Sequence, residues 1–123
     1  MSRVVSVAAV AAVSLVAAGS AGAASTQVHA AKSCSISGQQ RSLGASYVTS
    51  LSVRHTRCST GKSVVRAYHA CRRAHGWKGK CRHRVKGYKC RRNIGASSPV
   101  QYDAKVVCRR GGKRVTHTYT QNR

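Results

Sequence analysis

The sequence predicts a small α+β domain in which one helix packs on an antiparallel sheet and disulfides staple the elements together. Three observations carry this prediction. Apolar and polar residues alternate over 47–53 and over 100–119, as they do in half-buried strands. Between these segments, residues 64–71 place apolar side chains at helical spacing. Six cysteines in a chain of 123 residues suit a disulfide framework. The expected order is strand, helix and three strands, a β-α-β-β-β domain.

The N-terminus has the pattern of a secretory signal peptide. Arg3 precedes a Val/Ala/Leu-rich stretch over 4–18, and Ala21-Gly22-Ala23 offers the small residues that signal peptidase requires. Cleavage after Ala23 would make residues 1–23 the signal peptide. We therefore expect a secreted protein, either extracellular or loosely held on an anionic cell envelope.

Residues 24–46 are small and polar and show no sustained period. We expect them to form a flexible N-terminal arm that is tied down at Cys34. The folded domain is expected to span 47–123. It begins with YVTSLSV, in which every second residue from Tyr47 to Val53 shares one face of a strand.

The stretch CSTGKSVVRAYHACRRAHG, residues 58–76, predicts the helix. Ser59 or Thr60 can cap its start, and Gly76 suits its end. The face expected to point inward comprises Val64, Val65, Tyr68 and Cys71. A cationic stripe expected to face solvent comprises Lys62, Arg66, His69 and Arg73.

The segment WKGKCRHRVKGYKCRR follows and is dense in cations. Lys and Arg occupy every second position from Lys78 to Lys86, so wherever the segment is extended these side chains lie on one face. The apolar positions shift parity from Val85 to Tyr88, and we expect a bulge or bend at Gly87.

The last third of the chain predicts a hairpin. Gly111-Gly112 permits a tight turn between two alternating segments. A two-residue loop would set Cys108 opposite Val115 and Val106 opposite His117, with His117 pointing inward.

Three stretches, TRCSTGKSVVRAYHACR, VKGYKC and AKVVCRRGGKRV, carry a resemblance. The chain from about Tyr47 to Tyr119 resembles an uncharacterised family of small, basic, cysteine-containing secreted proteins of high-GC Gram-positive bacteria. The resemblance implies export and a small β-α-β-β-β domain, and it implies no activity.

The motif Gly61-Lys62-Ser63 matches only the end of a phosphate-binding loop. The first glycine of that motif would fall at position 56, which is Thr56. A nucleotide site would also need an acid for Mg²⁺, and Asp103 is the only acidic residue. The sequence therefore argues against nucleotide hydrolysis.

The cysteines and histidines are close enough in sequence to suggest zinc. The relevant residues are Cys71, His75, Cys81, His83 and Cys90. Their spacing matches no standard zinc pattern, and export favours oxidation, so we expect no metal and no cofactor. All six cysteines, Cys34, Cys58, Cys71, Cys81, Cys90 and Cys108, are expected to form disulfides. The preferred pair is Cys71 with Cys81, and the other pairings stay open.

Catalysis has few candidate residues. A carboxylate pair is impossible with one acid, which excludes the usual glycosidase and aspartic-protease sites. A histidine-dependent ribonuclease is the alternative, and its pool comprises His55, His69, His75, His83 and His117.

Charge is the strongest signal, because 23 Lys and Arg stand against one acid and give a formal net charge of +22. The cations must find counter-charges outside the chain. We expect a monomeric, non-catalytic protein that binds an anionic polymer: an envelope polyanion, a nucleic acid or an anionic membrane surface. The expected contact residues are Lys62, Arg66, Arg73, Trp77, Lys78, Lys80, Arg82, Arg84, Lys86, Tyr88 and Lys89, with the rings supplying stacking. A cationic antimicrobial or protease-inhibitory protein is a further alternative.

Overall fold

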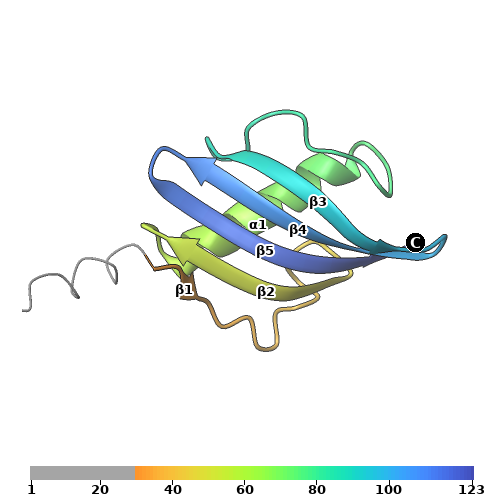
Figure 1. The fold of residues 1–123 in the computed structure, drawn as a ribbon, viewed down its shortest axis with the longest axis horizontal. Helices are drawn as coiled ribbons and strands as arrows, with labels where there is room; N and C mark the ends of the chain where they lie inside the picture. Colours follow the sequence, from red (N-terminus) through yellow and green to blue (C-terminus); the bar gives the residue numbers. More distant parts are fainter. Residues whose placement is uncertain (1–29) are drawn as a thin grey trace, which may run out of the picture.

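A computed structural model describes residues 30–123, in which one helix packs on a five-stranded antiparallel sheet (Figure 1). The elements are β1 (Lys32–Ser33), β2 (Tyr47–Arg54), α1 (Cys58–Arg73), β3 (Lys89–Ser97), β4 (Gln101–Arg110) and β5 (Lys113–Asn122). The sheet order is β1-β2-β5-β4-β3. The predicted fold class is confirmed, whereas the predicted signal peptide, residues 1–23, lies outside the described residues. Within residues 30–123, no helix is long and apolar enough to cross a membrane.

The C-terminal hairpin has the predicted register. Cys108 pairs with Val115 and Val106 pairs with His117 across β4 and β5. Gly111 adopts a φ of 55°, the left-handed conformation that glycine tolerates best and that a primed turn requires. The turn chemistry therefore fixes which side chains of both strands face the helix.

The helix packs on β5, the central strand of the sheet, and on its neighbour β2. It approaches them at Gly61, where an added Cβ would lie 2.7 Å from Cγ1 of Val53. Val64, Val65 and Tyr68 are buried as predicted. The cap prediction is wrong, because the N-cap is Arg57 and no side chain caps the helix.

His69 lies on the buried side of the helix, which corrects its assignment to the exposed cationic stripe. It follows Val65 by four residues, so both point toward the sheet. The segment before β2 covers it from the other side, since a Cβ at Gly44 would lie 2.7 Å from Cβ of His69. Arg72, four residues after Tyr68, is also fully buried.

The cation-dense segment from Lys78 to Lys86 is a loop, and β3 begins only at Lys89. Its start is held by hydrogen bonds to main-chain carbonyls. Arg92 donates to the carbonyls of Gly79 (2.8 Å) and Lys78 (3.0 Å). The expected bend is present at Gly87, whose φ is 80°. These contacts keep the alternating cations from sharing one strand face.

The residues assigned to an N-terminal arm contribute to the core where the structure describes them. β1 pairs with β2, and Leu43 is fully buried. Cys34 is bonded to Cys58 at the start of the helix.

Three disulfides use all six cysteines. The preferred Cys71–Cys81 pair is confirmed. The remaining bond joins Cys90 to Cys108, which are direct partners in the β3–β4 register. The bonds therefore tie the arm to the helix, the helix to the loop, and one edge of the sheet to its neighbour.

Candidate functional site

The sheet has one covered face and one open face. Side chains of β4 that point toward the helix are buried, and the intervening ones are exposed or half-buried. The same alternation holds in β5. We call the surface turned away from the helix the outer face. Because strand side chains alternate, the registers of the four long strands determine which residues are neighbours there.

Four cations lie side by side across the outer face. The registers pair Arg54 of β2 with Arg114 of β5, Arg114 with Arg109 of β4, and Arg109 with Lys89 of β3. We call these four residues the cation row. Neighbouring strands lie about 4.8 Å apart, so the row extends about 14 Å across the sheet.

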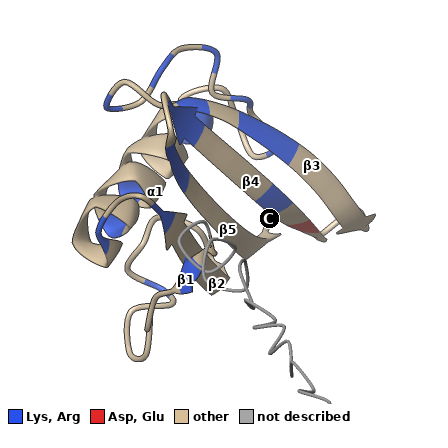
Figure 2. Cartoon of the chain, turned by 60° about the vertical axis from the view of Figure 1, so that its left-hand side comes forward, with Lys and Arg blue, Asp and Glu red and all other residues tan. Residues whose placement is uncertain are grey.

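Further cations extend the row over β3 and β4. Arg91 and Lys105 share the outer face; Arg91 lies two residues along β3 from Lys89, and Lys105 lies four residues along β4 from Arg109. A groove of about 720 Å³ on this half of the sheet is lined by Lys89, Arg91, Arg92, Asn93, Lys105, Val107 and Arg109. Figure 2 shows lysine and arginine along β3 and β4, and the acid Asp103 is the third residue of β4.

The cation row cannot be neutralised by this chain. Like charges on directly opposed residues destabilise a sheet, and here the repulsion is repeated across three strand pairs. The only acidic side chain, Asp103, accepts a hydrogen bond of 2.6 Å from Thr120. Nε of Arg54 is buried without a hydrogen-bond partner. The row is therefore an energetic cost that a bound anion would offset.

Most of the predicted contact cations are exposed, whereas the two predicted aromatic rings are not available for stacking. Of the cations, Arg66, Arg73, Lys78, Lys80, Arg82, Arg84, Lys86 and Lys89 are exposed and Lys62 is half-buried. Tyr88 is buried, so it offers no surface for stacking, contrary to expectation. Trp77 is half-buried, packs edge-on against Tyr102, and lies under the cations of Lys78 and Arg123.

The cation row itself was missed in the sequence, although Lys89 was among the predicted residues. Along their strands, the apolar residues that face the core alternate with residues on the opposite face, and that opposite face includes Arg54, Arg109 and Arg114. The alternation in the sequence could have placed the three arginines on the outer face. Only the strand order β2-β5-β4-β3 brings them beside Lys89.

A second polar cluster lies inside the molecule, around Arg72. Nε of Arg72 donates to Nδ1 of His69 at 2.7 Å, and Nη2 donates to Oε1 of Gln121 at 2.6 Å. Nη1 reaches the hydroxyl of Tyr102 at 3.4 Å and the carbonyl of Trp77 at 3.5 Å. The guanidinium also lies 4.9 Å from the ring centre of Tyr119. Neutral acceptors and one aromatic face thus surround a fully buried cation.

The hydrogen bonds fix the tautomers of two buried histidines. Arginine can only donate, so Nδ1 of His69 must accept and its proton lies on Nε2. That nitrogen is 3.0 Å from Nε2 of His117, which must therefore accept. The proton of His117 then lies on Nδ1, a buried atom without a hydrogen-bond partner. Both rings are neutral in this arrangement.

Burial keeps the two histidines neutral. It lowers the pKa of His69 from its ordinary value to about 2, with the proximity of His117 and Arg72 adding to the effect. Burial and Arg72 lower the pKa of His117 to about 3. In the same cluster, burial raises the pKa of Tyr102 to about 12.

This geometry removes one histidine pair, His69 and His117, from the residues that a histidine-dependent ribonuclease could use. In the described part of the chain, His69 and His117 lie within hydrogen-bonding distance of each other. Both are fully buried, so a polymer in solution cannot reach them. General acid–base catalysis on RNA requires such contact.

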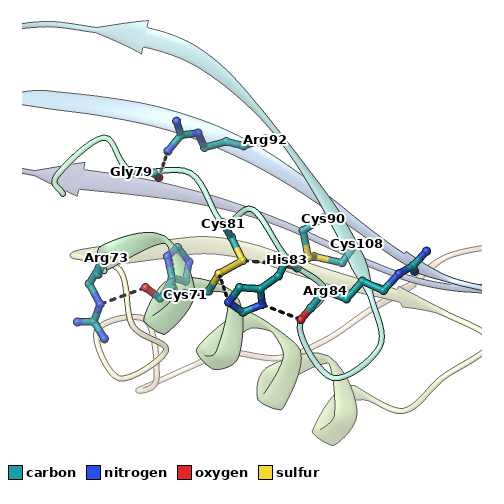
Figure 3. Close-up of a disulfide and its surroundings, with 10 residues drawn as sticks. Cys71, Arg73, Gly79, Cys81, His83, Arg84, Cys90, Arg92 and Cys108 are labelled. Carbon is teal, nitrogen blue, oxygen red and sulfur yellow. Dashed lines mark hydrogen bonds between the residues drawn. A yellow bond between two sulfur atoms is a disulfide. The ribbon is translucent and has the colours of Figure 1, made fainter. Parts of the chain in front are cut away.

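Cys71, Cys81 and His83 form the third cluster, and their ligand-type atoms all lie within 4.8 Å of one another. Figure 3 shows the imidazole of His83 against the Cys71–Cys81 disulfide. Thiolates bind metals, whereas a disulfide has consumed both thiols. The oxidised cluster therefore leaves His83 as its one metal-binding group.

The Gly-Lys-Ser motif lies inside the helix and not in a loop. Gly61 is buried, and its N–H donates to the carbonyl of Arg57 at 3.0 Å. A phosphate cradle needs free N–H groups in a loop, so the motif serves helix packing.

Comparison with protein-family models, with curated proteins and with solved structures finds no match to this chain.

Proposed function

We propose that the protein is a secreted, non-catalytic binding protein for linear anionic polymers, and that the outer face of its sheet is the contact surface. The polymer is an envelope polyanion or a nucleic acid backbone. The signal-peptide pattern and the three disulfides support the extracellular location.

The cation row is the single observation that carries this proposal. Four cations are held at neighbouring strand positions on a face that the helix leaves open. Guanidinium groups bind phosphate and carboxylate through paired hydrogen bonds, and three of the four residues are arginines. A polymer laid across the strands would meet all four charges in sequence.

The surroundings of the row favour recognition of charge over recognition of bases. Tyr88 is buried and Trp77 is already covered by cations. Thr116 and Thr118 of β5 share the outer face and offer hydroxyl groups beside the row. We expect affinity to depend on the density of anionic groups along the polymer.

The test compares two charge-matched double variants of the oxidised protein. Arg109→Gln/Arg114→Gln removes two charges from the row, and Arg66→Gln/Arg73→Gln removes two exposed charges from the helix. Binding of polyphosphate, a single-stranded oligonucleotide and a polyuronate is measured from about 50 mM to about 300 mM salt. For each polymer that binds, we expect the row variant to lower the slope of log affinity against log salt by about 1.5.

The helix variant is expected to keep the wild-type slope. Equal losses in both variants would mean that net charge acts without a defined surface, and would overturn the assignment to the outer face. A wild-type affinity that does not change with salt would overturn the proposed function itself.

A further inference from the structure

The Cys71–Cys81 disulfide differs from the other two in its exposure. Both of its cysteines are half-buried. Each of the other bonds includes a buried cysteine, Cys34 in one and Cys108 in the other. A thiol in solution therefore has the best access to Cys71–Cys81.

The disulfide also has an imidazole beside it. Nε2 of His83 lies 3.4 Å from Sγ of Cys71, and Nδ1 of His83 lies 3.0 Å from the carbonyl oxygen of Arg84 (Figure 3). A carbonyl can only accept, so Nδ1 carries a proton. When His83 is protonated, its second N–H points at Sγ of Cys71.

Two surface hollows, each about 300 Å³, meet at Cys81. One is lined by Arg82, Arg84 and Lys89 together with Cys81. The other is lined by Lys80, Arg91 and Arg92 together with Cys81. Cations that line a concave surface concentrate anions there. An anionic reagent is therefore directed to Sγ of Cys81.

Release of a thiolate at Cys71 needs a local cation. Cys71 lies in the last turn of the helix, where the helix dipole opposes negative charge. A protonated His83 would offset the dipole through its N–H. Attack at Cys90, which also borders the hollows, would instead release a thiolate on the fully buried Cys108.

We propose that Cys71–Cys81 is a thiol-exchange site for anionic thiols. A thiolate RS⁻ attacks Sγ of Cys81, the bond between Cys81 and Cys71 breaks, and Cys81 forms a mixed disulfide with R. The electron pair leaves on Sγ of Cys71, which takes the Nε2 proton of His83. A second thiolate RS⁻ then attacks the R-side sulfur of the mixed disulfide, which releases RSSR and leaves Cys81 as a thiolate, so that both cysteines are reduced.

Hydrogen bonds also hold the loop that the Cys71–Cys81 disulfide closes, so the loop does not depend on the disulfide alone. Arg92 holds the carbonyls of Lys78 and Gly79, and Tyr102 donates to the carbonyl of Trp77 at 3.1 Å. Opening the disulfide is therefore expected to leave the helix and sheet folded.

The experiment measures the rate and the site of exchange in the full oxidised protein. Mercaptosuccinate, 2-mercaptoethanol and cysteamine serve as the anionic, neutral and cationic thiols, compared at equal thiolate concentration and low salt. Mass spectrometry after alkylation identifies the opened bond. We expect Cys71–Cys81 to open first, with the anionic thiol about tenfold or more faster than the cationic one.

His83→Gln is expected to slow the opening about tenfold, with His75→Gln as the exposed control at the wild-type rate. Earlier opening of another disulfide, equal rates for the three thiols, or a wild-type rate in His83→Gln would each overturn the proposal.

Discussion

Arg72 and Arg114 present the same group in opposite settings. The guanidinium of Arg72 is fully buried and donates to His69, Gln121, Tyr102 and Trp77. Arg114 lies on the outer face between two further arginines, Arg54 and Arg109, in the strand register.

The difference separates structural charge from charge that is available for binding. With one acidic side chain in the chain, neither arginine can rely on an ion pair. The fold satisfies Arg72 with neutral acceptors, which are costly to leave unpaired. It leaves the cation row to repel itself, and that repulsion is removed when an anion binds. Four predictions test this contrast.

Arg72→Ala should give the largest effect, a loss of about 4 kcal/mol in the free energy of unfolding. The change leaves a cavity in place of a large buried side chain and removes the donor to Nδ1 of His69 and Oε1 of Gln121. Arg73→Ala, an exposed neighbour, should change stability by less than about 0.5 kcal/mol. Urea denaturation monitored by Trp77 fluorescence provides the measurement.

Arg72→Lys tests whether stability depends on the positive charge of Arg72 or on the several hydrogen bonds that its guanidinium group donates. Lysine keeps the positive charge but cannot donate in the directions that guanidinium does. We expect Arg72→Lys to lose about 2 kcal/mol or more of stability. Wild-type stability in Arg72→Lys would show that the hydrogen bonds to neutral acceptors do not hold the cluster together.

The two buried histidines, His69 and His117, should make the free energy of unfolding depend on pH. Their pKa values are lowered in the folded state to about 2 and about 3, while the unfolded state keeps the ordinary value of 6.5. Below pH 6.5 the unfolded chain therefore binds protons that the folded chain does not. Stability is complete above pH 6.5 and falls as the pH is lowered toward the folded-state values, by roughly 3–4 kcal/mol at about pH 5.

This acid sensitivity is unusual because carboxylates contribute little to it: Asp103 is the only acidic side chain. Urea denaturation at several pH values between about 8 and about 5 measures the slope. The exposed double variant His75→Gln/His83→Gln should keep that slope. A stability that stays constant over this range contradicts the neutral, hydrogen-bonded histidine pair.

The sequence predicted the parts of the fold that local pattern encodes. Alternation and Gly111-Gly112 placed His117 opposite Val106, and spacing within the helix placed Tyr68 inward. Pattern also predicted the Cys71–Cys81 bond, because a short loop brings the two cysteines together.

The rest depends on contacts that are distant in sequence. His69 was expected in the exposed cationic stripe, since nothing local shows that His117 supplies an acceptor for its Nε2 proton. The acceptor that Gln121 supplies to Arg72 is also distant in sequence. The cation row needs the order of the strands as well as their parity, and Arg54 is joined to Arg114 only by that order.

The smallest predicted effect has the opposite sign. Arg114→Gln should raise the free energy of unfolding by about 0.5 kcal/mol at low salt, because it removes a charge that lies opposite both Arg54 and Arg109. The gain should shrink at high salt, where exposed charges are screened. The same change should weaken polymer binding, so that stability and affinity move in opposite directions.

Arg66→Gln, which removes an equal charge from the exposed side of the helix, is the control. If Arg114→Gln gains no more stability than Arg66→Gln, the row carries no repulsion of its own, and its advantage as a binding surface over the other cations of this chain is lost.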